Sequence, residues 1–332
     1  MTYPAGDPAP ESWQRGFEQL MCEDPGGAAD ALLAAWPDVE RDTARVERLR
    51  ANAEALLESS GDALWDGGLH PVVFRAGNSL PHQGMLTAAV TYWERLLPVA
   101  EARLGPDHPD TLTIKNNLHW AYGRAGDADR ALTGFRELLV SRVRVLGPDH
   151  QNTLATRHAV ATWQDECGDR DGAVHQLREL IADYARVLGP DHRDTLNTRI
   201  ALAEILGVAD PAAAVSELRL LLDDFRRVLG FDDPEVLEVE VELSAWLAET
   251  GNFDEALSRM DRVLGDYRRV LGPTHHDTLT LRFLAADTRR RAGRRDEAEK
   301  AMQRLYDEVA ALAGQGHPEV VDLKSSIEDW AA

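Results

Sequence analysis

The stretch Leu104–Leu112, LGPDHPDTL, decides the fold because it returns along the chain at a nearly constant interval. Three clear copies read LGPDHQNTL, LGPDHRDTL and LGPTHHDTL, at 146–154, 188–196 and 271–279. Two weaker copies read LGFDDPEVL and GQGHPEVV, at 229–237 and 314–321. The leading leucines of the first five copies are separated by 42, 42, 41 and 42 residues, which is typical of stacked structural repeats.

A second turn signal lies midway between these copies. It reads GDADRA at 126–131 and has counterparts at 168–173, 251–256 and 293–298. Between the two signals the apolar residues follow helical spacing, and no proline interrupts them. Each unit of about 42 residues therefore predicts two helices joined by short turns.

The LGPDHPDTL turn also carries end signals for both helices. Gly105 suits a left-handed helix end, and Pro109 suits a first helical turn. Asp107 is expected to cap the next helix, with Asp110 three residues later. An arginine stands two residues before each repeat leucine, where it offsets the helix macrodipole: Arg144, Arg186, Arg227 and Arg269.

The pattern predicts an all-α solenoid of antiparallel helix pairs. We expect a flexible tail at 1–10, a helical cap at 11–69, six helix pairs at 70–313 and a capping helix at 314–332. The pairs are expected at about 70–104, 106–146, 148–188, 190–229, 231–271 and 273–313. Terminal elements must close such an array because each repeat buries its core against its neighbours.

The composition makes some classes of partner and cellular location less favourable than others. The 332 residues hold 57 acidic and 36 basic side chains, a net charge of -21, which disfavours nucleic acid and anionic membrane surfaces as partners. No apolar run is long enough to span a membrane, and Met1–Leu20 does not resemble a secretion signal. We therefore expect a cytoplasmic protein. Cys22 and Cys167 are expected to be small buried side chains.

The repeat resembles a known family. The residues Leu118, Tyr122, Gly126, Ala131 and Phe135 resemble the tetratricopeptide consensus. The 42-residue period, LGPDHPDTL and the Asn-Asn-Leu sequence at 116–118 resemble the kinesin-light-chain type. Such arrays often form the C-terminal sensor of bacterial STAND regulators, whose ATPase needs a glycine-lysine phosphate loop; none of the three lysines here follows a glycine.

The resemblance implies a right-handed superhelix whose first helices line a concave groove for a protein or peptide. By alignment with the repeat, nine residues of the first three pairs are candidate partner-binding residues: Arg75, Asn78, His82, Asn116, Asn117, Trp120, Arg124, His158 and Thr162. Asn117 is the strongest candidate, although its repeat equivalents are alanines. A recurring basic position, Lys115, Arg157, Arg199 and Arg282, either lines the groove or covers apolar helix surface with its long stems, and we favour the second.

The sequence gives little support for a catalytic site or a metal site. The recurring histidines His108, His150, His192 and His275 stand one repeat apart, so they fit a turn role better than a shared metal site. Hydrolase and zinc-protease motifs are absent from the sequence, and no cofactor is expected. A scaffold or adaptor that binds a protein or peptide is the leading hypothesis. A peptide-gated sensor and an enzyme or biosynthetic accessory remain open alternatives.

Overall fold

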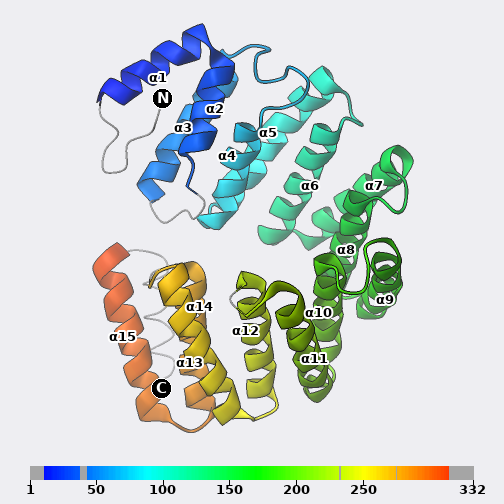
Figure 1. Cartoon of the computed structure of the whole chain (residues 1–332), viewed down its shortest axis with the longest axis vertical. Helices are drawn as coiled ribbons and strands as arrows, with labels where there is room; N and C mark the ends of the chain where they lie inside the picture. The colour runs from blue at the N-terminus through cyan, green and yellow to red at the C-terminus, as the bar shows by residue number, and fades with distance from the viewer. Residues whose placement is uncertain (1–10, 38–42, 232, 274, 314–332) are drawn as a thin grey trace. The chain divides into compact units, whose positions relative to one another are not determined.

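The computed structural model describes residues 11–37, 43–231, 233–273 and 275–313. These residues form fifteen α-helices, and none of the described ones lies in a β-strand (Figure 1). The predicted tail at 1–10 and the predicted capping helix at 314–332 lie outside the described residues. No helix in the described ranges is both long and apolar enough to cross a membrane.

The chain divides into two compact units, Met1–Gln176 and Leu177–Ala332, with the boundary inside α9. The first three helices precede the repeats: α1 (Glu11–Glu23), α2 (Pro25–Ala35) and α3 (Thr43–Ser59). The rest of the first unit contains α4 (Pro71–His82), α5 (Leu86–Leu104), α6 (Pro109–Arg124), α7 (Ala128–Leu146), α8 (Gln151–Glu166) and the start of α9 (Arg170–Val187).

The second unit continues the same alternation. After the remainder of α9 it contains α10 (Arg193–Gly207), α11 (Pro211–Leu229), α12 (Pro234–Glu249), α13 (Phe253–Val270), α14 (His276–Arg291) and α15 (Arg295–Ala313). From α4 to α15 the helices fall two by two within the intervals expected from the repeat. The division into tail, cap, six pairs and closing helix stays a prediction.

The recurring histidine explains why the motif starts a helix. His108 Nδ1 accepts from the backbone N–H of Asp110 at 3.2 Å, so His108 is the N-cap of α6. The same bond recurs at His70, His150, His192 and His275, with distances of 3.1 to 3.3 Å. In the weaker copy Asp233 replaces histidine and accepts from Glu235 N–H at 2.9 Å.

The prediction that Asp107 caps α6 is therefore wrong. Because Pro109 is the first helical residue, the cap falls on position 108, and Asp107 lies one residue too early. Its carboxylate instead accepts two hydrogen bonds from Arg144 at 2.6 and 2.8 Å, which lower the pKa of Asp107. Arg227 binds Asp191 in the same way, at 2.8 Å for both bonds. Arg144 and Arg227 thus join consecutive repeat turns, beyond their expected effect on the macrodipole.

One core runs through the described part of the first unit. Phe17 of α1 and Leu49 of α3 belong to the same buried cluster as Trp93, Phe135 and Leu138 of the repeats. Trp93 is 1% exposed and lies against Gly77, where a Cβ would overlap its ring. Side chains of the helices that precede the repeats therefore share a hydrophobic core with the first repeats.

The second unit holds a buried ionic cluster on α12. The side chain of Glu240 is 4% exposed and accepts from Arg226 of α11 and from Arg259 and Arg262 of α13. The Arg259 and Arg262 contacts measure 2.8 and 2.9 Å. Because a buried carboxylate needs compensation, these arginines fix α11, α12 and α13 together.

The expectation of buried cysteines is also wrong. Cys22 and Cys167 are both exposed. Cys22 lies in the last turn of α1, and Cys167 is the C-cap residue of α8, so neither position faces a core.

Candidate partner-binding face

We define the first-helix face as the solvent side of α4, α6 and α8 in the first unit. It is assembled where α4 meets α6, since these two helices are in contact. Asn117 Nδ2 of α6 donates to Asn78 Oδ1 of α4 at 3.1 Å, and Asn78 is exposed. Two predicted residues, 39 positions apart, therefore lie side by side.

A chain of hydrogen bonds extends inward from the Asn78–Asn117 pair. Asn116 Nδ2 contacts Asn117 Oδ1 at 3.4 Å, and Asn116 Oδ1 accepts from Arg142 at 3.2 Å. Arg142 is 5% exposed and also donates to Asn152 O and Thr156 Oγ1. Its burial lowers the pKa of Arg142 to about 10. Arg142 thus occupies the carbonyl oxygen of the Asn116 side chain. The Asn116 amide is therefore less available to a partner than that of Asn117.

Trp120 lies deeper than an anchor for a partner requires. Its indole meets the rings of Phe135 and Trp163 edge-on, with centroids 5.4 Å away in both cases. The residue is half-buried and packs against the core of the first unit. Only part of its ring surface can take part in binding.

Two of the candidate partner-binding residues, Arg124 and Arg75, are arginines with different surroundings. Arg124 is exposed, and within the described ranges it has no hydrogen bond or ion pair. It lies seven residues after Asn117, on the same side of α6. Arg75 donates to Pro37 O at 2.6 Å, which ties it to the segment after α2. His82 is in the last turn of α4, but its side chain lies outside the described residues.

His158 and Thr162 lie one turn apart on α8. Both are half-buried, and Thr162 Oγ1 donates to the backbone O of His158 at 3.1 Å. The hydroxyl is therefore partly engaged within its own helix. The structure brings together Asn78, Asn116 and Asn117, and it leaves Arg124 open to solvent.

Three of the four residues at the recurring basic position form ion pairs with a neighbouring helix. Lys115 of α6 contacts Glu101 of α5 at 2.8 Å, and Arg282 of α14 contacts Glu308 of α15 at 2.8 Å. Arg199 of α10 binds Glu217 and Asp224 of α11 at 2.7 and 3.1 Å. These ion pairs link a first helix to a neighbouring second helix, an electrostatic role that the sequence pattern does not show.

The corresponding helices of the second unit carry acids. Burial, with Glu242 as a second cause, raises the pKa of Glu204 on α10 to about 7. Burial also raises the pKa of Glu242 on α12. Glu249 is neutralised by Arg291 through contacts of 2.6 and 3.0 Å.

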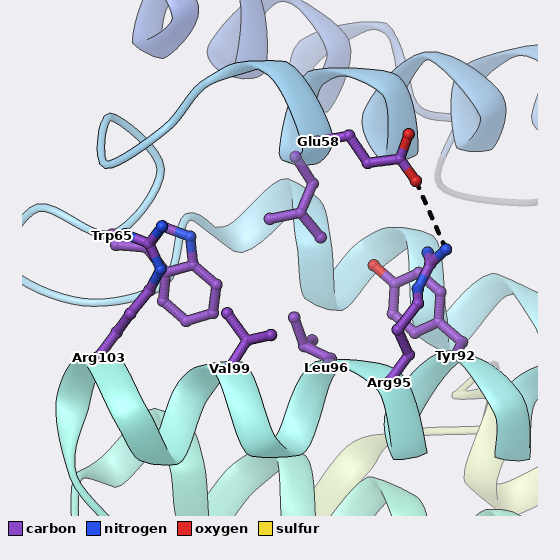
Figure 2. A pocket seen from close by; sticks show the side chains of 8 residues that line it. Glu58, Trp65, Tyr92, Arg95, Leu96, Val99 and Arg103 are labelled. Carbon is purple, nitrogen blue, oxygen red and sulfur yellow. Dashed lines mark ion pairs between the residues drawn. The ribbon is translucent and has the colours of Figure 1, made fainter.

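The first unit contains a cavity that the sequence analysis did not predict. It has a volume of about 190 Å³ and lies between α3, the segment after it and α5 (Figure 2). Its lining is Leu57, Glu58, Trp65, Tyr92, Arg95, Leu96, Val99 and Arg103. Nothing in the repeat pattern marks these residues, because the cavity forms against a helix that precedes the repeats.

Comparison with known proteins agrees with the helical architecture. Family models described as tetratricopeptide repeat match residues 73–140, 153–194 and 235–307, which together span more than half of the chain. No curated protein matches the chain.

Solved structures show the same fold at low identity. A kinesin-light-chain type protein with nearly identical repeats, from Podosopora anserina, is 21% identical, with a TM-score of 0.50 over 60% of this chain and 95% of that one. A tetratricopeptide repeat protein from Parabacteroides merdae is 14% identical, with a TM-score of 0.56 over 96% and 100%. A Rap protein complexed with competence and sporulation factor is 10% identical, with a TM-score of 0.50 over 95% and 97%.

The matched repeats and the helix pairs confirm an all-α repeat solenoid with kinesin-light-chain-like neighbours. The chain belongs to the tetratricopeptide repeat family.

Proposed function

We propose that this protein is a scaffold or adaptor that binds a protein or peptide segment on the first-helix face. Tetratricopeptide solenoids are typically protein-interaction scaffolds and are generally not catalytic. A regulatory role in the cytoplasm is part of the proposal. Nucleic acid and membrane surfaces are not expected partners, because the charge of -21 repels both.

The observation that carries the proposal is the Asn78–Asn117 hydrogen bond. It sets the amides of two neighbouring repeats side by side at the surface, and each amide retains donor or acceptor capacity for a peptide backbone. Arg124 adds an exposed guanidinium two turns farther along α6, which can bind a carboxylate with two parallel hydrogen bonds. Trp120, His158 and Thr162 supply the surface between and beside these groups.

The test begins with a peptide selected from a random display library against the full chain. Its dissociation constant is then measured for the unaltered protein and for Asn117→Ala and Arg124→Glu. We expect each change to weaken binding by about tenfold, because each removes one or two hydrogen bonds to the partner. Arg136→Glu is the matched control, since Arg136 is an exposed arginine on α7. Unchanged affinity in both face variants, with folding intact by circular dichroism, contradicts the proposal.

A peptide-gated sensor is the second candidate. The Rap protein with a similar fold was solved with a bound factor, which makes ligand control a reasonable test for this chain. In such a sensor the selected peptide changes the solution dimensions of the full chain. Small-angle scattering with and without saturating peptide distinguishes the two: a changed radius of gyration favours the sensor, and an unchanged one favours the scaffold.

A further inference from the structure

The cavity between α3 and α5 has the features of a binding site separate from the first-helix face. Its volume of about 190 Å³ exceeds the roughly 150 Å³ of an engineered cavity that holds benzene. Leu96 and Val99 of α5 give it an apolar floor, and Trp65 lies at one end (Figure 2). Leu57 of α3 also lines it. Val99 is 41% exposed, so part of this floor faces solvent.

The charges around the floor are of both signs, and each arginine there has a carboxylate partner. Two of the three charged lining residues, Arg95 and Arg103, are cations, and Glu58 is the third. Both arginines come from α5, eight residues apart, which separates their backbones by about 12 Å. An occupant therefore meets a cation at each end of the apolar floor.

The two arginines are not equivalent. Arg103 is engaged, because it pairs with Asp62 and its guanidinium lies 5.3 Å from the centre of the Trp65 ring. Arg95 reaches Glu58 and Glu54 only at 3.5 and 3.6 Å, and it makes no hydrogen bond among the described residues. Its guanidinium donors are therefore available to a ligand.

The local acids do not prevent such a ligand from binding. The side chains of Arg95, Glu58 and Glu54 are 52%, 70% and 35% exposed, so both ion pairs of Arg95 are weak and can be replaced. Tyr92 supplies no further polar partner, since its hydroxyl donates to Val73 O at 2.8 Å inside the core. One strong polar contact, at Arg95, is thus what the cavity offers.

We infer that this cavity binds a monocarboxylate with a single apolar body, the carboxylate on Arg95 and the body over Leu96 and Val99 against Trp65. The ligand is either a free organic acid or the C-terminal residue of a peptide, which share this chemistry. Since α3 and α5 both line the cavity, occupancy also strengthens the contact between the first three helices and the repeats.

The test is calorimetric titration of the full chain with 4-phenylbutyrate and with its uncharged amide. For a ligand of this size we expect a dissociation constant on the order of 1 mM for the acid. We expect the amide to bind at least about tenfold more weakly, because it loses the charge-assisted hydrogen bonds. N-acetylphenylalanine distinguishes the sources: Arg95-dependent binding of this probe supports a peptide C-terminus, and binding of phenylbutyrate alone supports a free acid.

Two variants locate the site. Arg95→Gln should weaken binding of 4-phenylbutyrate by about tenfold or more, and Val99→Glu should abolish it by placing a charged group on the apolar floor. Arg170→Gln is the matched control, because Arg170 is an arginine of the same unit paired with Asp165 at 3.0 Å. Asn117→Ala, on the first-helix face, should leave this binding unchanged. Equal binding of acid and amide, or full binding by Arg95→Gln, overturns the inference.

Discussion

The indole of Trp163 in α8 lies directly over the Cα of Gly123 in α6, so closely that a Cβ at position 123 would overlap the ring. Trp246 of α12 lies over Gly207 of α10 in the same way. Position 165, one repeat after Gly123, is aspartate, and position 248, one repeat after Gly207, is alanine. Glycine and tryptophan therefore occur together at alternate repeats and set how closely consecutive first helices approach.

Gly123→Ala should lower the free energy of unfolding by about 2 kcal/mol, because the methyl group forces the Trp163 ring out of its packed position. Gly265→Ala is the matched control: Gly265 lies inside α13 with open space around its Cα, so alanine should add about 0.5–1 kcal/mol. Urea unfolding of both variants checks the signs. A stabilised Gly123→Ala protein would show that the indole moves aside without cost.

Glu240→Gln should destabilise the second unit by about 3 kcal/mol, because it leaves three arginines around a neutral amide. Arg262→Gln is the control, since the Arg262 side chain is 57% exposed and its pair should contribute less than about 1 kcal/mol. Thermal unfolding gives both values. Similar costs for the two changes would mean that the Glu240 carboxylate is well hydrated.

His150→Ala should destabilise the protein by about 1 kcal/mol through loss of the N-cap of α8. His150→Asp should retain most of this energy, because Asp233 already serves as the cap in the weaker copy of the motif. For a unit of this size the alanine change corresponds to a shift in Tm of roughly 2–4 °C. Equal melting temperatures for the alanine variant and the unaltered protein would rule out a capping role.

The stability of the first unit should fall as the pH falls from about 6.5 to about 4. Burial lowers the pKa of His119 to about 4, so in this window the unfolded chain takes up a proton that the folded chain does not. The loss is on the order of 2 kcal/mol. His119→Gln should remove this part of the pH dependence, as measured by urea unfolding at pH 7 and pH 4.5. Parallel pH profiles for the two proteins would contradict the burial of His119.

Glu204 should give the stability a pH dependence of the opposite sign to that of His119. Because its pKa is raised to about 7, the folded chain holds a proton between about pH 4.5 and 7 that the unfolded chain has released, and stability falls as the pH rises through this window. Glu204→Gln should therefore stabilise the protein at pH 8 by about 2 kcal/mol and change little at pH 4.5. Glu101→Gln is a suitable control, since Glu101 is paired with Lys115. A destabilised Glu204→Gln protein at pH 8 would indicate a favourable role for the carboxylate.

The repeat motif was sufficient to predict the helix pairs, because Gly105, His108 and Leu112 act locally: each sets a turn, a cap or a buried helix position within a few residues of itself. The capping residue was misassigned by one position, since a carboxylate at 107 and an imidazole at 108 are both plausible acceptors from sequence. Only the tertiary structure shows that Arg144 binds the carboxylate, because that contact joins residues 37 positions apart.

The candidate site was predicted less well than the fold. Alignment identified Asn78 and Asn117, but it could not show that Trp120 packs against Phe135 and Trp163 or that Arg75 binds the backbone of Pro37. These contacts depend on how side chains from different helices share space, which periodicity does not encode.

The sequence alone determined that this chain forms tetratricopeptide-type helix pairs, because turn and helix signals act over short distances and recur in every repeat. The tertiary structure decided which polar side chains remain exposed, and it decided that α3, the segment after it and α5 line a cavity. Both depend on long-range packing: a side chain is available for binding only when no other part of the chain already occupies it.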